Sequence, residues 1–154
     1  RLRDGLINLD GTVLIKPSIN TLFSFSEGRG LVRDKSLRYY FISENANMYD
    51  GFYQSAQKFK HGVAPVKRRE KWGLINLKGM WVSRPKYNQI ERLDNGLILA
   101  KINGYMGLTN LNGEFLTPLK YLQLDISKEN IFLMETSNGI DYLKPNGEWI
   151  WQSN

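Results

Sequence analysis

The chain has 154 residues, of which 42% are hydrophobic and 12% aromatic, a composition typical of folded rather than disordered proteins. It contains no cysteine, which excludes disulfide bonds and cysteine-based zinc sites, and it has no apolar run near the ~20 residues of a membrane-spanning helix. The net charge is +6, with 18 Lys and Arg against 9 Asp and Glu in residues 1–101, and 3 against 6 in residues 102–154. This asymmetry favours the first part of the chain as the contact for any anionic partner.

Pairs of residues six positions apart recur along the chain. The pairs are Gly5 with Gly11, Tyr40 with Ala46, Gly73 with Gly79, Gly107 with Gly113, and Asp141 with Gly147. Their first members lie at positions 5, 40, 73, 107 and 141, so the spacings are 35, 33, 34 and 34 residues. A fixed period of this size indicates a tandem repeat architecture. We expect one repeat array over residues 1–154, with units at about 3–36, 37–69, 70–103 and 104–137 and a partial unit at 138–154.

Most units carry the signal of a β-hairpin early in the repeat. The turn pairs, each flanked by apolar and β-branched residues, are Asp10-Gly11, Lys78-Gly79, Asn112-Gly113 and Asn146-Gly147. Glycine, and next best Asn or Asp, adopts the positive φ that a two-residue hairpin turn requires. We therefore expect two-residue turns that place these residues opposite each other: Ile7 with Leu14, Ile75 with Val82, Thr109 with Leu116, and Leu143 with Ile150.

A proline and a third strand follow the hairpin. Pro17, Pro85 and Pro118 lie eleven or twelve residues after Gly5, Gly73 and Gly107, the first members of their pairs. Proline fixes φ and lacks an N–H group, so it ends the second strand. No long amphipathic helix is evident. The sequence therefore predicts an all-β protein, a tandem array of about five three-stranded antiparallel β-units with a repeat of about 34 residues, open and solenoid-like, with a closed ring as the alternative.

The clearest copy runs from Trp72 to Tyr87 and contains Trp72-Gly73, Gly79 and Pro85. It resembles the WG (also KWG) β-repeat family, and the stretch from Phe25 to Arg33 looks like the second signature of that family. The resemblance implies a bacterial tandem β-repeat protein that serves as an interaction or scaffold region, and it implies no catalytic residues. We expect the residues that carry the repeat to be structural: Trp72, Gly73, Gly79, Trp81, Pro85, Tyr87, Gly107 and Gly113.

No arrangement of side chains in the sequence indicates catalysis or metal binding. His61 is the only histidine, and it occupies a loop position filled by Glu27 and Asn95 in other units, so we expect it to be exposed. No calcium-loop pattern occurs, and the glycines form no phosphate-binding loop because each is isolated at a turn. We therefore expect a protein that is not an enzyme and has no cofactor and no metal. Because the chain begins at Arg1, we expect it to be a fragment, and no localisation is inferred.

The densest basic cluster lies where the second and third units meet. We expect an interaction surface formed by Arg29, Arg33, Arg38, Lys67, Arg68, Arg69 and Lys71, with Trp151 as a separate exposed aromatic residue. The principal functional prediction is a non-enzymatic module that binds a partner protein or acts as a scaffold. The alternatives are binding of nucleic acid or another polyanion through the basic surface, and binding of carbohydrate or the cell envelope through exposed aromatic residues.

Overall fold

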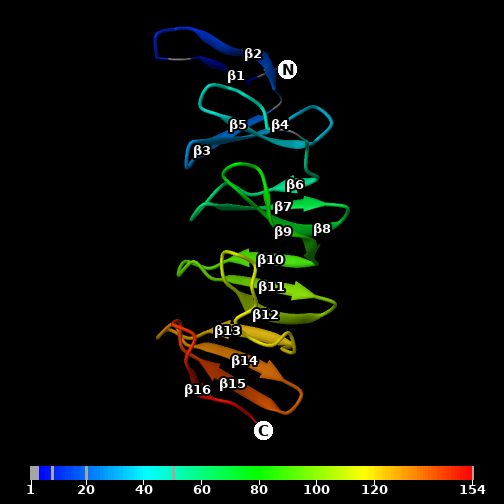
Figure 1. The fold of residues 1–154 in the computed structure, drawn as a ribbon, viewed down its shortest axis with the longest axis vertical. Helices are drawn as coiled ribbons and strands as arrows, with labels where there is room; N and C mark the ends of the chain where they lie inside the picture. The colour runs from blue at the N-terminus through cyan, green and yellow to red at the C-terminus, as the bar shows by residue number, and fades with distance from the viewer. Residues whose placement is uncertain (1–3, 8, 20, 50, 154) are drawn as a thin grey trace. The chain divides into compact units, whose positions relative to one another are not determined.

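The structure is a computed structural model that describes residues 4–7, 9–19, 21–49 and 51–153. These residues form strands and turns without any helix, so the prediction of an all-β fold is confirmed. The strands form five antiparallel sheets of two to four strands, none of which closes into a barrel (Figure 1). The chain divides into two compact units, unit 1 from Arg1 to Pro85 and unit 2 from Lys86 to Asn154.

Unit 1 contains three sheets. The first pairs β1 (Asp4–Ile7) with β2 (Val13–Ile19). The second has the order β3 (Thr21–Ser26), β4 (Arg29–Arg33), β5 (Tyr39–Ser43), and the third has the order β6 (Ser55–Ala56), β7 (Val63–Arg68), β8 (Lys71–Asn76), β9 (Trp81–Tyr87). In Figure 1 these sheets succeed one another as layers.

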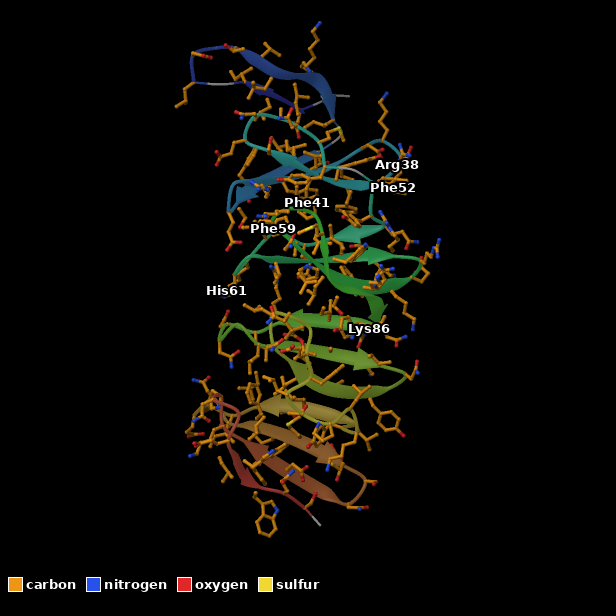
Figure 2. All side chains as sticks on the ribbon, in the orientation of Figure 1. Arg38, Phe41, Phe52, Phe59, His61 and Lys86 are labelled. Carbon is orange, nitrogen blue, oxygen red and sulfur yellow. The ribbon has the colours of Figure 1, made fainter. Side chains whose placement is uncertain are left out.

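The core of unit 1 fills the space between its second and third sheets. Leu31 and Phe41 from the second sheet pack with Ala64, Val66 and Ile75 from the third. Ring centroids of Phe41 and Phe59 are 4.8 Å apart, and Figure 2 shows both side chains in the interior. A hydrogen bond also links the second sheet to the segment between β6 and β7. Ser26 Oγ donates to the main-chain carbonyl of Phe59 at 2.6 Å.

Unit 2 contains two sheets. One has the order β10 (Gln89–Arg92), β11 (Ile98–Ile102), β12 (Tyr105–Thr109), and the other has the order β13 (Gln123–Ile126), β14 (Phe132–Thr136), β15 (Gly139–Leu143), β16 (Trp149–Trp151). Its core is formed by Leu93, Leu108, Tyr121, Phe132, Met134 and Leu143. Each unit therefore has a hydrophobic core of its own.

The predicted two-residue turns at the repeat hairpins are wrong. The loop has three residues: Asn110 N–H donates to the carbonyl of Glu114 at 3.0 Å, and Gly113, with φ of 76°, completes a type I turn with a bulge. The physical reason is the Asn110 side chain, whose Oδ1 accepts from the N–H groups of Asn112 and Glu114 and closes an Asx turn. The same loop follows Asn76, whose Oδ1 accepts from Lys78 and Met80.

The extra loop residue moves the pairing by one position. Ile7 lies opposite Val13, Thr109 opposite Phe115, and Leu143 opposite Trp149, so three of the predicted cross-strand pairs are wrong by one residue. The pair of Ile75 with Val82 stays a prediction. A shift of one position exchanges the faces of a strand, which is why Trp149 reaches the core of unit 2.

The sheets do not coincide with the sequence repeats. The last strand of one predicted unit, β7, pairs along its whole length with the first strand of the next, β8, from Val63 opposite Asn76 to Arg68 opposite Lys71. In unit 2, β11 pairs with β12 in the same way, from Ile98 opposite Thr109 to Ile102 opposite Tyr105. Each of these two sheets therefore combines strands from two adjacent sequence repeats, because tight turns at about residues 69 and 103 join the last strand of one repeat to the first strand of the next.

True two-residue turns occur at these junctions between repeats and also within repeats. Both turn residues have positive φ, the geometry of a type I′ turn, at the junctions Arg69-Glu70 and Asn103-Gly104 and, inside units, at Glu27-Gly28 and His61-Gly62. The turn of Arg69 (φ 50°) and Glu70 (φ 59°) is exceptional, since neither residue is glycine, asparagine or aspartate. Glu70 is held there by Gln54, whose Oε1 accepts from its N–H at 2.9 Å.

Thr109 is a polar residue in a core position of unit 2. Its side chain is 0% exposed, and among the described residues its Oγ1 has no hydrogen-bond partner. The residues one repeat away on either side, Ile75 and Leu143, are apolar. We expect Thr109→Val, which keeps the shape and removes the buried hydroxyl, to raise the free energy of unfolding of unit 2 by about 1–2 kcal/mol in urea titration.

Thr117 provides the matched control for this change. It is also buried, but its Oγ1 accepts the N–H of Leu108 at 2.9 Å. Thr117→Val should therefore lower the free energy of unfolding by about 1–3 kcal/mol, because it leaves a buried N–H group without an acceptor. Equal effects of the two substitutions would contradict this account of Thr109.

Candidate interaction surface

The β7–β8 hairpin of unit 1 carries a cluster of basic side chains at its turn. Arg68 ends β7, Arg69 is the first turn residue, and Lys71 begins β8. Because the turn has only two residues, the end of β7 and the start of β8 lie close together. The three cations, which occupy four positions of the sequence, therefore lie at one end of the hairpin. The adjacent strand β9 adds Arg84, and Trp81 and Pro85 lie beside it.

These residues line a groove, here named the basic groove. Its volume is about 360 Å³, and its lining residues are Arg68, Arg69, Lys71, Trp81, Arg84 and Pro85. No acidic residue belongs to this lining. Within the described part of the chain, Arg69, Lys71 and Arg84 form no ion pair. The groove therefore holds an uncompensated positive charge on an open surface.

Arg68 is fixed in the wall of the groove. Its guanidinium carbon lies 5.3 Å from the ring centre of Tyr53 and 5.6 Å from that of Trp81. Its Nη2 donates to the carbonyl of Phe52 at 3.3 Å. Burial raises the pKa of the Tyr53 hydroxyl, and the charge of Arg68 opposes that shift. Cation–π contacts and a main-chain acceptor thus hold Arg68 in one orientation before any ligand arrives.

A second hollow adjoins the basic groove and is named the Phe52 pocket. Its volume is about 480 Å³, and it is lined by Gly51, Phe52, Gln54, Arg68 and Arg69, of which Arg68 and Arg69 also line the basic groove. The Phe52 side chain is 46% exposed. Its ring centre lies 5.0 Å from the guanidinium carbon of Arg38, and Figure 2 shows the two side chains together at one edge of unit 1.

Only part of the predicted basic surface comes together at this groove. Lys67 lies outside the lining and pairs with Glu70 at 2.9 Å, a contact that lowers the pKa of Glu70. Arg29 lies over the ring of Tyr49 and donates from Nε to the carbonyl of Leu77 at 3.1 Å, so it joins two sheets of unit 1.

The other two predicted arginines also have structural contacts. Arg33 lies over the rings of Phe23 and Tyr39, at 5.8 Å from each centre. Arg38 forms an ion pair with Asp34 at 2.8 Å, and the hydrogen bond that Arg38 donates to Asp34 raises the pKa of Arg38. Since Arg38 also contacts Phe52, it supports the edge of the Phe52 pocket, whereas Arg33 does not line either hollow.

Trp151 and the predicted structural residues lie as follows. Trp151 is in unit 2, where it is 60% exposed and pairs with Tyr142 of β15. Gly73, Tyr87 and Gly107 are buried, Trp72 and Trp81 are partly buried, and Gly79 and Gly113 occupy left-handed turn positions.

Pro85 lies within β9 instead of ending it, so the predicted strand end at Pro85 is wrong. The strand β9 lies at the edge of its sheet, where a proline is tolerated.

Sequence reasoning missed Arg84 and Phe52 as site residues. Arg84 is thirteen positions beyond Lys71 and reaches the groove only because β9 is the sheet neighbour of β8. Phe52 lies in the least regular repeat, where no pattern pointed to it. His61, by contrast, lies in an exposed turn as predicted, at the opposite edge of unit 1 from Arg38 and Phe52 (Figure 2).

Unit 2 has a hollow of a different character. Its volume is about 500 Å³, and its lining mixes Glu91, Arg92 and Asp94 with Leu93, Asn95, Ile126, Asn130, Phe132 and Pro145. Arg92 and Asp94 both have interaction partners, and the charged groups of this lining are of both signs. In the described residues of the chain there is no group of three or more His, Asp or Glu side chains placed to hold a metal ion. The same residues include no helix long and apolar enough to cross a membrane.

Comparison with known families identifies the repeat. The family model described as "WG containing repeat" matches residues 5–36 and residues 72–105. These two segments begin at Gly5 and Trp72, the first and third copies of the sequence repeat. The predicted resemblance to WG β-repeats is therefore confirmed for these segments. No curated protein matches the chain in sequence.

Several solved structures match this chain at low sequence identity and with TM-scores below 0.5. The computationally designed protein Ika4 is 15% identical, with a TM-score of 0.45 over 92% of this chain and 98% of that one. The HIRA fragment 644–1017 is 10% identical, with a TM-score of 0.42 over 84% of this chain and 51% of that one. The WD40 β-propeller domain of Doa1 is 13% identical, with a TM-score of 0.37 over 94% of this chain and 59% of that one. The chain thus spans little more than half of the latter two, and scores this low carry no inference about function.

Proposed function

We propose that this chain, which contains WG repeats at residues 5–36 and 72–105, is a non-enzymatic binding module that acts as a scaffold and contacts an anionic partner through the basic groove. Partners of this class are an acidic segment of a partner protein and a nucleic acid. The observation that carries the proposal is the groove itself, with four basic side chains and no acidic one in its lining.

The charge of unit 1 supports this role. Unit 1 contains 15 Lys and Arg against 7 Asp and Glu, a net charge of +8, whereas unit 2 contains 6 against 8, a net charge of −2. A positive field of this kind raises the association rate of anionic partners and weakens as salt is added. The groove concentrates that field where Arg69 and Arg84 lack acidic partners.

The rigidity of the groove also supports a binding role. The Arg68 side chain is held by two rings and a carbonyl oxygen, and a two-residue turn fixes the main chain of Arg69. Side chains that are already ordered lose less conformational entropy when a partner binds. The electrostatic attraction is therefore offset by a smaller loss of conformational entropy than it would be at mobile surface lysines.

The test is binding of a labelled oligoglutamate peptide, followed by fluorescence anisotropy. We expect binding at about 50 mM salt and at least a tenfold weaker affinity at about 200 mM. The double variant Arg69→Asp with Arg84→Glu should weaken binding at about 50 mM salt at least roughly tenfold. The control variant Lys35→Glu with Lys78→Glu changes the net charge equally at exposed residues of unit 1 outside the groove, and should change affinity about twofold or less.

Equal weakening by the two double variants would show that binding is diffuse and would contradict the role of the groove. Urea unfolding of both variants serves to confirm that they are folded. If neither oligoglutamate nor an oligonucleotide binds at low salt, the proposal is wrong.

A further inference from the structure

We infer that the basic groove and the Phe52 pocket together form a binding site for single-stranded nucleic acid. This inference rests on the proposed function, because it names the class of anionic partner that the groove accepts. The two hollows adjoin at Arg68 and Arg69, which line both, and they supply two chemically different halves of the proposed site.

The two halves match the two parts of a nucleotide. The basic groove supplies Arg69, Lys71 and Arg84, which suit the phosphate groups of a backbone. The Phe52 pocket offers the flat aromatic ring of Phe52, a residue that is 46% exposed, for a base to stack on. Single-stranded nucleic acid presents a phosphate and a flat base in every residue, so one strand can satisfy both halves at once.

The Phe52 ring is supported in its position. The guanidinium of Arg38 lies over it, and the carbonyl of Phe52 accepts a hydrogen bond from Arg68. Gly51 permits this approach, because a Cβ at that position would lie 2.8 Å from Arg68 Nη2 and because its φ is 87°. The same arginine thus joins the base-stacking half to the phosphate-binding half. A ring held in this way stacks with little loss of conformational entropy.

An acidic polypeptide or a duplex fits this site less well. Carboxylate side chains would satisfy the basic groove but have no flat group to place against Phe52. In a duplex the base faces are stacked on each other, so an exposed ring has no base face to contact without opening the helix. The exposed ring beside the cations is therefore the observation that distinguishes these three ligands.

The experiment compares labelled oligo-dT, an oligoglutamate of equal charge and a DNA duplex by fluorescence anisotropy. We expect oligo-dT to bind at least about tenfold more tightly than either competitor at about 50 mM salt. Phe52→Leu should weaken oligo-dT about tenfold and leave oligoglutamate unchanged, because one stacking contact is lost. The control Phe25→Leu removes a comparably exposed ring of unit 1 outside both hollows and should have little effect on either ligand.

Salt dependence measures the phosphate contacts separately. For oligo-dT, Arg69→Asp with Arg84→Glu should reduce the slope of log K against log salt by about 1.4, since each phosphate contact on a single strand contributes about 0.7. Phe52→Leu should leave that slope unchanged. The two variants therefore separate charge from stacking within one site.

The outcomes distinguish the inference from the proposed function. If oligo-dT and oligoglutamate bind equally and Phe52→Leu affects neither, the inference is overturned while the role of the groove as an anion-binding surface stands. A duplex that binds as tightly as oligo-dT overturns the preference for single strands. Absence of binding by all three probes overturns both proposals.

Discussion

Gly73→Ala should destabilise unit 1 by about 3 kcal/mol or more, although it adds a single methyl group. A Cβ at Gly73 would lie 2.7 Å from the carbonyl oxygen of Ser83, 2.8 Å from the Trp81 ring and 2.9 Å from the nitrogen of Pro85. Two of these three atoms belong to the main chain of β9, so the clash cannot be relieved by rotating a side chain. The strand β9 must move away from β8, and the Trp81 packing against Tyr53 is lost with it.

Gly107→Ala gives the matched comparison in unit 2. There the added Cβ would meet the Phe115 side chain at 3.0 Å and the carbonyl of Pro118 only at 3.4 Å. A ring can shift more easily than a main chain, so this substitution should cost about 1–2 kcal/mol. Hydrogen exchange measured by mass spectrometry on peptides from β8 and β12 reports the two units separately. A larger effect at Gly107 than at Gly73 would contradict the main-chain explanation.

Asp141→Asn should destabilise unit 2 by about 3 kcal/mol at neutral pH, because it replaces a buried, fully bonded carboxylate. The Asp141 side chain is 0% exposed. Its Oδ1 accepts from the N–H and Oγ of Ser153 at 2.8 and 2.7 Å, and its Oδ2 accepts from Tyr121 Oη at 2.9 Å and lies 3.2 Å from Lys120 Nζ. In asparagine an NH₂ group replaces one of the two carboxylate oxygens. That NH₂ group would face hydrogen-bond donors, either those of Ser153 or those of Tyr121 and Lys120.

The same carboxylate makes the stability of unit 2 depend on pH. Burial by itself raises the pKa of Asp141, but the hydrogen bonds from Ser153, Tyr121 and Lys120 outweigh it and lower the pKa from 3.8 to about 2. The folded state therefore binds this proton less readily than the unfolded state does. The resulting stabilisation, about 2 kcal/mol, is present above about pH 4 and is lost as the pH falls towards 2.

Urea unfolding at a series of pH values between about 5 and 2 measures this contribution as the difference between wild type and Asp141→Asn. That difference should shrink by about 2 kcal/mol over the range. Ser153→Ala serves as the control: it removes one of the donors, costs about 1 kcal/mol and retains most of the pH dependence. A difference that stays constant with pH would show that Asp141 does not carry the effect.

The sequence predicted the strands and the repeat because both have local physical causes. Alternating apolar residues and the glycines of the 34-residue period indicate where strands begin and end, and Gly73 and Gly107, one repeat apart, are both buried. The predicted two-residue geometry of the hairpin turns was wrong because the side-chain oxygens of Asn76 and Asn110 accept hydrogen bonds that close three-residue loops. An Asn-x-x-Gly pattern carries this signal, since the asparagine lies three positions before the glycine.

The site was only partly predictable. The run from Lys67 to Lys71 contains three of the basic residues that line the groove, but the turn at Arg69-Glu70 has no turn-forming residue and gave no sign of a hairpin. Arg84 joins the groove through sheet neighbours, and Phe52 joins it through contacts with Arg38 and Arg68. Such contacts between distant residues leave no periodic trace in a sequence.

The offset between repeats and sheets decides where this chain can be divided. A fragment that starts at residue 70, the boundary suggested by the repeat, begins with β8 and lacks β7, its partner along the whole strand. Its first strand would present unpaired main-chain groups and a freshly exposed apolar face, both of which favour aggregation. A cut between sheets, after β9, keeps each paired strand with its neighbour. Any recombination that exchanges whole sequence repeats must likewise re-form a strand pair on both sides of the exchanged segment.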